Sequence, residues 1–319
     1  MSDAAAPPPA PAARWRDVDG ILLLDKPEGL TSNAALQRVR RLFRARKAGH
    51  TGSLDPLATG LLPVCLGQAT KASGLLLDAD KTYRVSIALG ERTATADREG
   101  EVVERAAVPD LAREFVERVA GGFLGESAQV PPMYSALKHR GERLYRLARQ
   151  GLEVERSPRN VVIRRLDLLG LEPGELRFEV ECSKGTYVRS LAEDIARACG
   201  TVGHVTSLRR LQLGPFRDPR MHRLDEVEQS FPGLQELDAL LLPTDAALAA
   251  LPAVHLGVAE QAFVLQGQPV FATAPGAVLV RMYGAEGRFL GVGRMSAEGR
   301  RLAPERIMID LSGRSTQRA

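Results

Sequence analysis

The order of its hydrophobic patterns limits the fold of this chain more than any other feature. Runs with the two-residue alternation of half-buried strands and stretches with the spacing of amphipathic helices follow one another along the sequence. They form no regular strand–helix–strand repeat of the kind that a doubly wound parallel sheet requires. The pattern therefore predicts an α+β fold, with a mixed, mostly antiparallel central sheet flanked by helices.

Individual elements are predicted from short apolar runs and their flanking residues. Residues 81–89 place Tyr83, Val85, Ile87 and Leu89 on one side of a strand. Further strands are expected at 20–25, before Leu66, at 161–169, at 176–182 and at 204–213. Helices are expected at about 69–77, 111–119, 137–150, 188–198 and near Leu224. Ser32 is expected to cap a helix whose inward residues are Leu36, Val39, Leu42 and Phe43.

The two ends of the chain differ from its middle in residue composition and hydrophobic pattern. The Ala/Pro-rich start lacks the basic and apolar regions of a secretory signal, so 1–17 is expected to be a disordered tail. From about Leu251, short alternating runs broken by glycine predict a small β-rich unit over 251–312, followed by a frayed tail at 313–319. No segment approaches the roughly 18 consecutive apolar residues that a membrane-spanning helix needs.

Basic residues gather in two places, although the net charge is only +4. The first cluster lies between Arg38 and Lys47, and the second comprises Lys138, His139, Arg140, Arg143, Arg146 and Arg149. Such clusters neutralise nucleic-acid phosphates, but for either cluster alone a solvated helix face is an equally good interpretation. Three cysteines without C-x-x-C spacing argue against disulfides or structural zinc and are expected to be buried free thiols of a cytoplasmic protein.

One carboxylate stands in a glycine-rich segment, G-H-T-G-S-L-D-P-L-A-T-G at 49–60. The glycines allow sharp turns and the close approach of a bulky ligand, and Pro56 biases Asp55 toward an extended backbone. A carboxylate on such a loop acts as a nucleophile or a general base, or merely caps a turn. The local sequence leaves these roles open. Metal ligation is disfavoured because no second carboxylate or suitable histidine pair lies nearby in the sequence.

Several segments, taken in order, resemble the bacterial TruB family of tRNA pseudouridine synthases. They are L-L-L-D-K-P at 22–27, the segment at 49–60, L-P-V-C-L-G-Q-A-T-K at 62–71, K-T-Y at 81–83, L-G-E-R-T-A-T-A-D at 89–97, V-P-P-M-Y-S-A-L-K at 130–138, K-G-T-Y-V-R-S-L-A at 184–192 and T-S-L-R-R at 206–210. The resemblance implies an enzyme that converts uridine 55 of the tRNA T loop to pseudouridine. It does so without cofactor or metal, by breaking the C1′–N1 bond and joining C1′ to C5.

The resemblance also implies roles for individual residues. Asp55 matches the essential aspartate, which attacks C1′ or C6 or removes a proton from C2′. Arg189 matches the arginine that pairs with this aspartate and keeps it ionised. Tyr83 matches the tyrosine that stacks on the flipped base, and His50 matches the histidine that fills the gap in the RNA stack. The remaining expected substrate-binding residues are the pocket-wall residues Tyr187 and Leu208, and Lys26, which supports the site or contacts phosphate.

The resemblance further implies two domains and one partner. A pseudouridine synthase domain is expected over 18–250, with an RNA-clamping insertion at about 124–155, followed by a PUA-like RNA-binding domain over 251–312. The expected partner is tRNA, contacted through its T arm and acceptor stem. The enzyme is expected to be a cytoplasmic monomer that needs neither a protein partner nor a membrane.

Two other functions stay open on the residues alone. A non-catalytic RNA chaperone or binding module would use the same basic surfaces and keep Asp55 as a structural residue. The other is an aspartate-nucleophile hydrolase acting on nucleosides or glycosides, although a glycosidase normally needs a second carboxylate as its acid and the motif holds none. Formation of pseudouridine in an unmodified tRNA transcript separates these functions.

Overall fold

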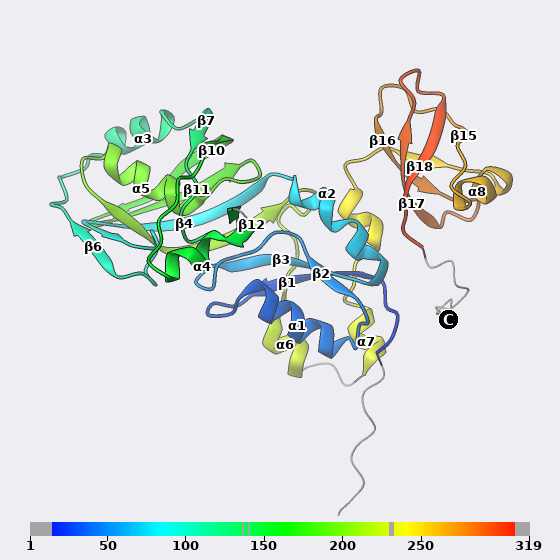
Figure 1. Cartoon of the computed structure of the whole chain (residues 1–319), viewed down its shortest axis with the longest axis horizontal. Coiled ribbons are helices and arrows are strands. Elements are labelled where there is room, and N and C mark those ends of the chain that lie inside the picture. Colours follow the sequence, from blue (N-terminus) through cyan, green and yellow to red (C-terminus); the bar gives the residue numbers. More distant parts are fainter. Residues whose placement is uncertain (1–14, 136, 140, 230–232, 310–319) are drawn as a thin grey trace, which may run out of the picture.

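The computed structural model describes residues 15–135, 137–139, 141–229 and 233–309. Within these residues the chain builds a nine-stranded sheet and, after residue 252, a separate five-stranded sheet (Figure 1). No helix in the described ranges is both long and apolar enough to cross a membrane.

The nine-stranded sheet carries the main core. Its strand order is β13-β1-β3-β12-β4-β11-β10-β7, with β2 paired to β3. The strands are β1 (Gly20–Lys26), β2 (Ala48–His50), β3 (Thr59–Leu66), β4 (Lys81–Leu89), β7 (Gly125–Gln129), β10 (Arg159–Glu172), β11 (Glu175–Cys182), β12 (Gly203–Leu213) and β13 (His222–Arg223). Parallel pairing is confined to β1 with β13 and β3 with β12. The predicted mixed, mostly antiparallel sheet is therefore confirmed.

Helices bury their apolar sides against this sheet. They are α1 (Ser32–Leu42), α3 (Arg113–Gly121), α5 (Val188–Ala198), α6 (Leu224–Gln229) and α7 (Leu234–Asp238). In α5 the residues Leu191, Ala192 and Ile195 recur at helical spacing and are buried with strand residues of the same core. Each fully buried leucine or isoleucine contributes roughly 1.5–3 kcal/mol to stability. As Figure 1 shows, α3 and α5 lie at one end of the sheet and α1 and α6 at the other.

Three local predictions need correction. The side chain that caps α1 belongs to Thr31, which accepts a hydrogen bond from the Ala34 amide, so Ser32 is the first helical residue. The stretch 69–77 is split into a 3-10 helix, η1 (Gly67–Lys71), and α2 (Ser73–Leu77). Finally, the ordered chain begins before residue 18, because Arg16 bridges to Ala45 and its guanidinium pairs with Asp238.

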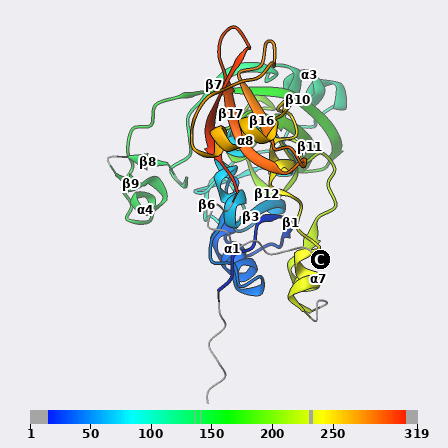
Figure 2. The ribbon, with the colours of Figure 1, turned by 90° about the vertical axis from the view of Figure 1, so that its right-hand side faces the viewer.

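The helix predicted at 137–150 is also wrong in its first half. That part is a small hairpin of β8 (Lys138–His139) and β9 (Glu142–Arg143), followed by α4 (Leu144–Arg149). Gly141 has φ +92°, a conformation that ends any helix. Figure 2 shows this hairpin and α4 standing to one side of the body of the molecule. The small sheet β5 (Glu91–Thr93) with β6 (Val102–Arg105) forms another projection at the end that carries α3.

The five-stranded sheet is a C-terminal β-rich unit. Its order is β14-β16-β17-β18-β15, with α8 (Val258–Leu265) beside it, and its strands are β14 (Ala253–His255), β15 (Val270–Phe271), β16 (Leu279–Tyr283), β17 (Phe289–Met295) and β18 (Arg301–Ile307). Val292 and Met308 share a hydrophobic cluster with Leu61 and Cys65 of β3. The Lys71 ammonium donates to the Ile307 carbonyl at 2.7 Å, and Arg306 donates to the Lys71 carbonyl at 2.7 Å. The 3-10 helix η2 (Thr244–Leu248) joins the same cluster.

The cysteines are placed as expected. Cys65, Cys182 and Cys199 are all buried and free. Burial raises the pKa of the Cys65 thiol to about 12, so this thiol remains protonated.

A close approach between β3 and β12 requires glycine at position 60. Gly60 lies opposite Arg210 in the parallel pairing and has φ +94°. A Cβ atom added to Gly60 would lie 2.3 Å from the Arg210 carbonyl oxygen. No side chain fits there without separating the two strands at the point where the glycine-rich segment ends.

Gly60→Ala is therefore expected to destabilise the protein by more than the roughly 1–3 kcal/mol that a strained backbone conformation alone costs. Gly174→Ala is the matched control, because Gly174 also has a positive φ (+78°) but has no atom within 4 Å of an added Cβ. Urea unfolding of both variants measures the difference. Equal losses of unfolding free energy would show that the contact with Arg210 costs nothing.

Candidate active site

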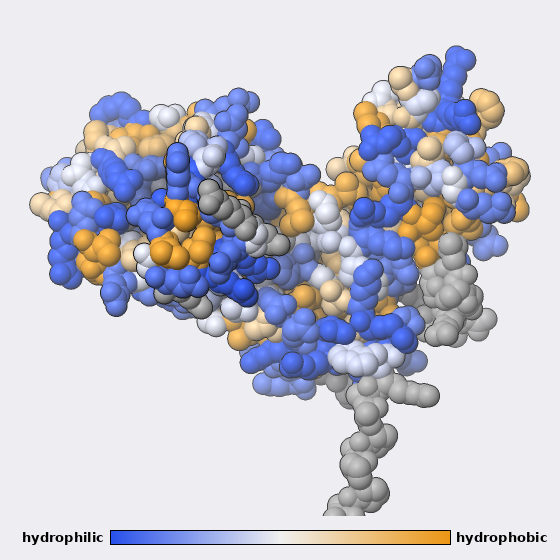
Figure 3. Space-filling model, in the orientation of Figure 1, coloured by the Kyte–Doolittle hydropathy of each residue, from blue (hydrophilic) through white to orange (hydrophobic). Residues whose placement is uncertain are grey.

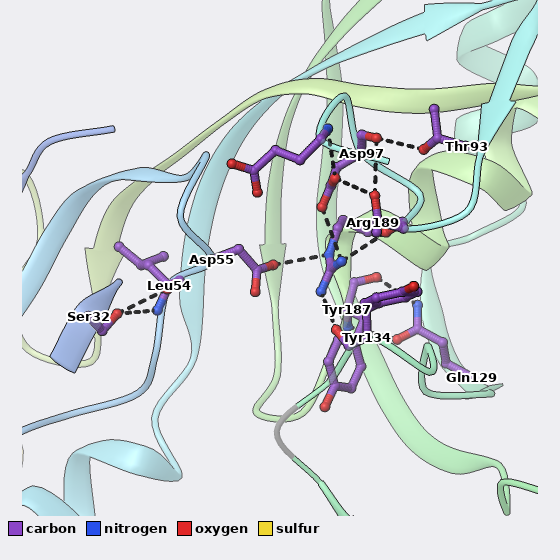
Figure 4. A network of polar contacts seen from close by, with 11 residues as sticks. Ser32, Leu54, Asp55, Thr93, Asp97, Gln129, Tyr134, Tyr187 and Arg189 are labelled. Carbon is purple, nitrogen blue, oxygen red and sulfur yellow. Dashed lines mark hydrogen bonds and ion pairs between the residues drawn. The ribbon is translucent and has the colours of Figure 1, made fainter. Parts of the chain in front are cut away.

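The loop that carries Asp55 is held on both sides of this residue. Before it, the Ser32 hydroxyl donates to the Leu54 carbonyl at 3.0 Å and accepts from the Leu54 amide at 2.7 Å (Figure 4). After it, the Gly29 amide donates to the Pro56 carbonyl at 2.8 Å. The start of α1 and the turn after β1 therefore fix the backbone that presents the Asp55 carboxylate.

Asp55, on the loop before β3, faces Arg189 of α5. The Arg189 Nε lies 3.0 Å from Asp55 Oδ2, and Figure 4 shows the two side chains pointing toward each other. The Arg189 side chain is only 6% exposed, whereas that of Asp55 is 41% exposed. One partner of the pair thus belongs to the core, and the other is open to an incoming ligand.

The rest of the Arg189 guanidinium is occupied by other chain segments. Nη1 donates to the Thr95 carbonyl at 2.8 Å and to Asp97 Oδ2 at 3.1 Å, and Nη2 donates to the Tyr134 carbonyl at 2.8 Å. Asp97 is buried and also accepts from the Thr95 hydroxyl at 2.6 Å. A buried cation needs such partners, and these four contacts from three chain segments restrict the orientation of the Arg189 guanidinium.

The surroundings of Asp55 act on its pKa in opposite directions. Loss of solvent raises the pKa above the ordinary aspartate value, and the nearby negative charge of Asp97 raises it further. The positive charges of Arg189 and Lys26 lower it. The pair with Arg189 thus stabilises the ionised carboxylate, while the raised pKa makes that carboxylate a stronger base and nucleophile than one in water.

Two tyrosines lie near this pair, and Leu208 belongs to the same hydrophobic core as one of them. Tyr83 is buried on β4, and Leu208 is buried on the neighbouring strand β12. Tyr187 immediately precedes α5, and its backbone is held by the Gln129 side chain through hydrogen bonds of 3.1 Å and 2.8 Å. Burial raises the pKa of both phenols, and the charge of Asp55 adds to the effect in each case. Both tyrosines are therefore close enough to Asp55 to sense its charge.

Lys26 lies beneath the loop as a structural support. It is fully buried, and its ammonium donates to the carbonyls of Pro27 at 2.8 Å, Leu30 at 2.6 Å and Pro56 at 3.3 Å. Burial lowers its pKa to about 8. Of the two roles expected for Lys26, these contacts fit support of the site, because a fully buried ammonium cannot reach a phosphate.

His50 ends β2 at the entrance to the glycine-rich loop. Its Nδ1 is buried and has no hydrogen-bond partner among the described residues. Burial and the positive charge of Arg210 lower its pKa, which favours the neutral ring. His50 is not part of the polar network that Figure 4 draws around Arg189.

Two functional residues were not singled out from the sequence. Asp97 ends the A-T-A-D segment, and its role depends on a contact with Arg189, 92 residues away. The other is Arg210, which is buried and donates from Nε to the Leu61 carbonyl at 2.7 Å and from Nη2 to the Gly52 carbonyl at 3.1 Å. The available signal was its position in the T-S-L-R-R segment, next to a second arginine on the same strand.

Arg210 closes the loop that carries Asp55. Its side chain holds Gly52 at the start of the loop, and its backbone pairs with Gly60 at the end. It forms no ion pair within the described parts of the chain. Its positive charge lowers the pKa of Tyr83, which lies opposite it on β4. Arg210 is thus a positioning residue that links the loop to the wall of the site.

In the described residues, no group of three or more histidine, cysteine, aspartate or glutamate side chains is arranged to hold a metal ion. The absence of cofactor and metal stays a prediction.

Models of known families match the chain in three consecutive parts. Residues 40–188 match the TruB family pseudouridylate synthase N-terminal domain, 189–249 match the tRNA pseudouridylate synthase B C-terminal domain, and 252–308 match the C-terminal domain of pseudouridine synthase II TruB. These matches place the chain among the pseudouridine synthases.

Curated relatives agree over nearly the full length. The tRNA pseudouridine synthase B of Nitrosococcus oceani is 53% identical over 93% of this chain and 97% of its own, and that of Stutzerimonas stutzeri is 52% identical over 92% and 96%. The chain belongs to the TruB family. Among solved structures, a Cbf5-Nop10-Gar1 complex contains a similar chain, with a TM-score of 0.70, 25% identity, and coverage of 91% of this chain and 85% of that one.

Arg210→Lys is expected to slow pseudouridine formation at saturating RNA by at least about tenfold, because a lysine cannot bond to the two ends of the loop at once and small displacements of a catalytic group are costly. Arg209→Lys is the matched control, because Arg209 is the neighbouring arginine and pairs with Asp25 at 2.7 Å. Single-turnover kinetics measures the rate, and circular dichroism confirms folding. Equal rates for the two variants would remove Arg210 from its positioning role.

Proposed function

We propose that this enzyme converts the uridine at position 55 of the tRNA T loop to pseudouridine, with Asp55 as the nucleophile. The observation that carries the proposal is the 3.0 Å pair between an accessible Asp55 and a buried Arg189 that three other hydrogen bonds hold in place. The tRNA substrate is supported by the names of relatives that are about half identical to this chain.

The reaction needs no group that the chain lacks. The C1′–N1 bond breaks, the uracil turns, C1′ bonds to C5, and the proton that leaves C5 is balanced by protonation of N1. The ionised Asp55 either attacks C1′ or C6 or takes the C2′ proton, and all three routes use the same carboxylate. Arg189 orients this group in each case, since its other hydrogen bonds hold the guanidinium in place.

The uridine reaches Asp55 only after it leaves the RNA stack. Tyr83 provides a flat face for the extruded base, and Leu208 and Tyr187 exclude water around it. His50, whose environment favours the neutral ring, fills the gap in the stack. Extrusion costs a few kcal/mol of stacking, and a planar side chain recovers part of that energy.

RNA contacts beyond the site follow from the projecting parts of the chain. The insertion at about 124–155 carries Arg143 and Arg146 on exposed positions next to Tyr145, and we assign it the role of clamping the T arm. A domain at 18–250 holds the site, and a PUA-like domain at 251–312 contacts the acceptor stem. The enzyme acts as a monomer without an obligatory protein partner, in the cytoplasm where its substrate is found.

The hydrolase alternative is disfavoured by the position of the second carboxylate. Asp97 is 2% exposed and bonded to Arg189, so it cannot deliver a proton to a leaving group. A binding module without chemistry would have no use for a buried arginine that orients an accessible aspartate.

Asp55→Asn is expected to abolish pseudouridine formation in an unmodified tRNA transcript while tRNA affinity stays within about threefold, because binding depends on the basic surfaces. Asp110→Asn, an exposed loop position, is the control and should keep full activity. Chemical adduct mapping by primer extension detects the product, without added metal or nucleotide. Product formation by Asp55→Asn would contradict the nucleophile, and its absence from the wild type would contradict the function.

The pH dependence of the reaction tests the charges around Asp55. Since the ionised form is required and its pKa is raised, the single-turnover rate should fall on acidification with a midpoint above 3.8, the ordinary aspartate value. Asp97→Asn removes a negative charge near Asp55, so the positive charge of Arg189 is less neutralised and lowers the Asp55 pKa further. The midpoint should therefore move to lower pH, and the maximal rate should fall. A midpoint that stays unchanged or rises would show that Asp97 does not act on Asp55 through its charge.

A further inference from the structure

The turn that follows α1 holds a residue in an unfavourable conformation. Arg44 has φ +48°, in the left-handed region where glycine is favoured and other residues are strained. Its amide donates to the Arg41 carbonyl, and the next amide, of Ala45, donates to the Arg40 carbonyl at 2.9 Å. This is the hydrogen-bonding pattern of a helix C-terminus that usually ends in glycine. The chain instead places an exposed arginine there.

The surrounding structure forces the strained conformation on the turn. The Arg16 amide donates to the Arg44 carbonyl at 2.8 Å, and the Arg46 amide donates to the Arg16 carbonyl at 2.9 Å. The Arg40 guanidinium donates to the carbonyls of Ala45 at 3.1 Å and Arg46 at 3.2 Å and stacks 4.6 Å above the Trp15 ring. These contacts hold the turn in place without a ligand. They use the backbone of Arg16 and the guanidinium of Arg40.

Apart from Arg40, the basic residues around this turn divide into two groups. Arg16, Arg38 and Arg46 pair with the carboxylates of Asp238, Glu228 and Asp17. Arg41, Arg44 and Lys47 are exposed and form no ion pair with any residue that the structure describes. The surface over α1, in the lower part of Figure 3, is mostly hydrophilic. Three unpaired cations on a rigid turn form a ready site for phosphate groups.

The turn lies close to the active site along the chain. Residue 48 begins β2, which ends at His50, so His50 lies six positions after Arg44. An extended chain of this length spans at most about 20 Å, a distance that a few nucleotides cover. An RNA that places its uridine beside His50 therefore passes near the turn.

We propose that Arg44, with Arg41 and Lys47, binds backbone phosphates of the RNA next to the uridine, and that the chain keeps a strained arginine at this turn for that contact. The proposal rests on the proposed function for the identity of the RNA. Its distinguishing consequence is that removing Arg44 acts on stability and on binding in opposite directions.

Arg44→Gly tests this consequence. Glycine relieves the strain, so the Tm is expected to rise, while the affinity for unmodified tRNA falls by about threefold to tenfold and the slope of log Kd against log salt decreases by about 1. The rate at saturating tRNA stays unchanged, because the turn does not touch the reacting atoms. Arg118→Gln, an exposed arginine on α3 at the other end of the sheet, should bind tRNA as the wild type does.

Arg44→Lys decides whether a binding defect comes from the charge. Lysine keeps both the positive charge and the strained backbone conformation. Wild-type tRNA affinity in Arg44→Lys would therefore show that the weaker binding of Arg44→Gly comes from the missing cation. Weaker binding by both variants overturns the proposal, as does an Arg44→Gly variant with wild-type affinity and salt dependence. A wild-type protein that does not bind tRNA would instead contradict the proposed function, so the two failures are distinguishable.

Discussion

The buried guanidinium of Arg189 is the interaction on which the site depends. It contacts Asp55, Thr95, Asp97 and Tyr134, which come from the loop before β3, the segment after β5 and the insertion. Thr95 and Asp97 belong to one segment, and the three segments are far apart in the sequence. Because each contact restricts the same planar group, the position of one segment restrains the others, and the position of the Asp55 carboxylate depends on all of them.

Much of the fold could be predicted because its signals are local. The alternation in 81–89 and the helical spacing in 188–198 each depend on nearby residues, and both elements form where expected. The insertion was harder, since a glycine with positive φ at 141 converts half of a helical pattern into a hairpin. Asp97 and Arg210 could not be assigned roles, because each role arises from a contact between residues about 90 to 160 positions apart.

The site separates two uses of buried charge. Arg189 and Lys26 are buried, and hydrogen bonds to backbone carbonyls and carboxylates offset the free-energy cost of removing their charges from water. Asp55, whose carboxylate pairs with Arg189, instead keeps an accessible face, at 41% exposure. Burial of Arg189, Asp97 and Lys26 thus leaves Asp55 as the accessible member of this group of charges.

The joint between the two sheets sets a fixed geometry for recognition. Val292 and Met308 pack against β3, which begins four residues after Asp55. The hydrogen bonds of Lys71 and Arg306 connect the same two parts of the chain. The C-terminal sheet therefore packs directly on the strand that follows the Asp55 loop. Under the proposed function, this contact sets the distance between Asp55 and the RNA-binding surface of the C-terminal unit, so an RNA with a longer or shorter stack would reach only one of the two.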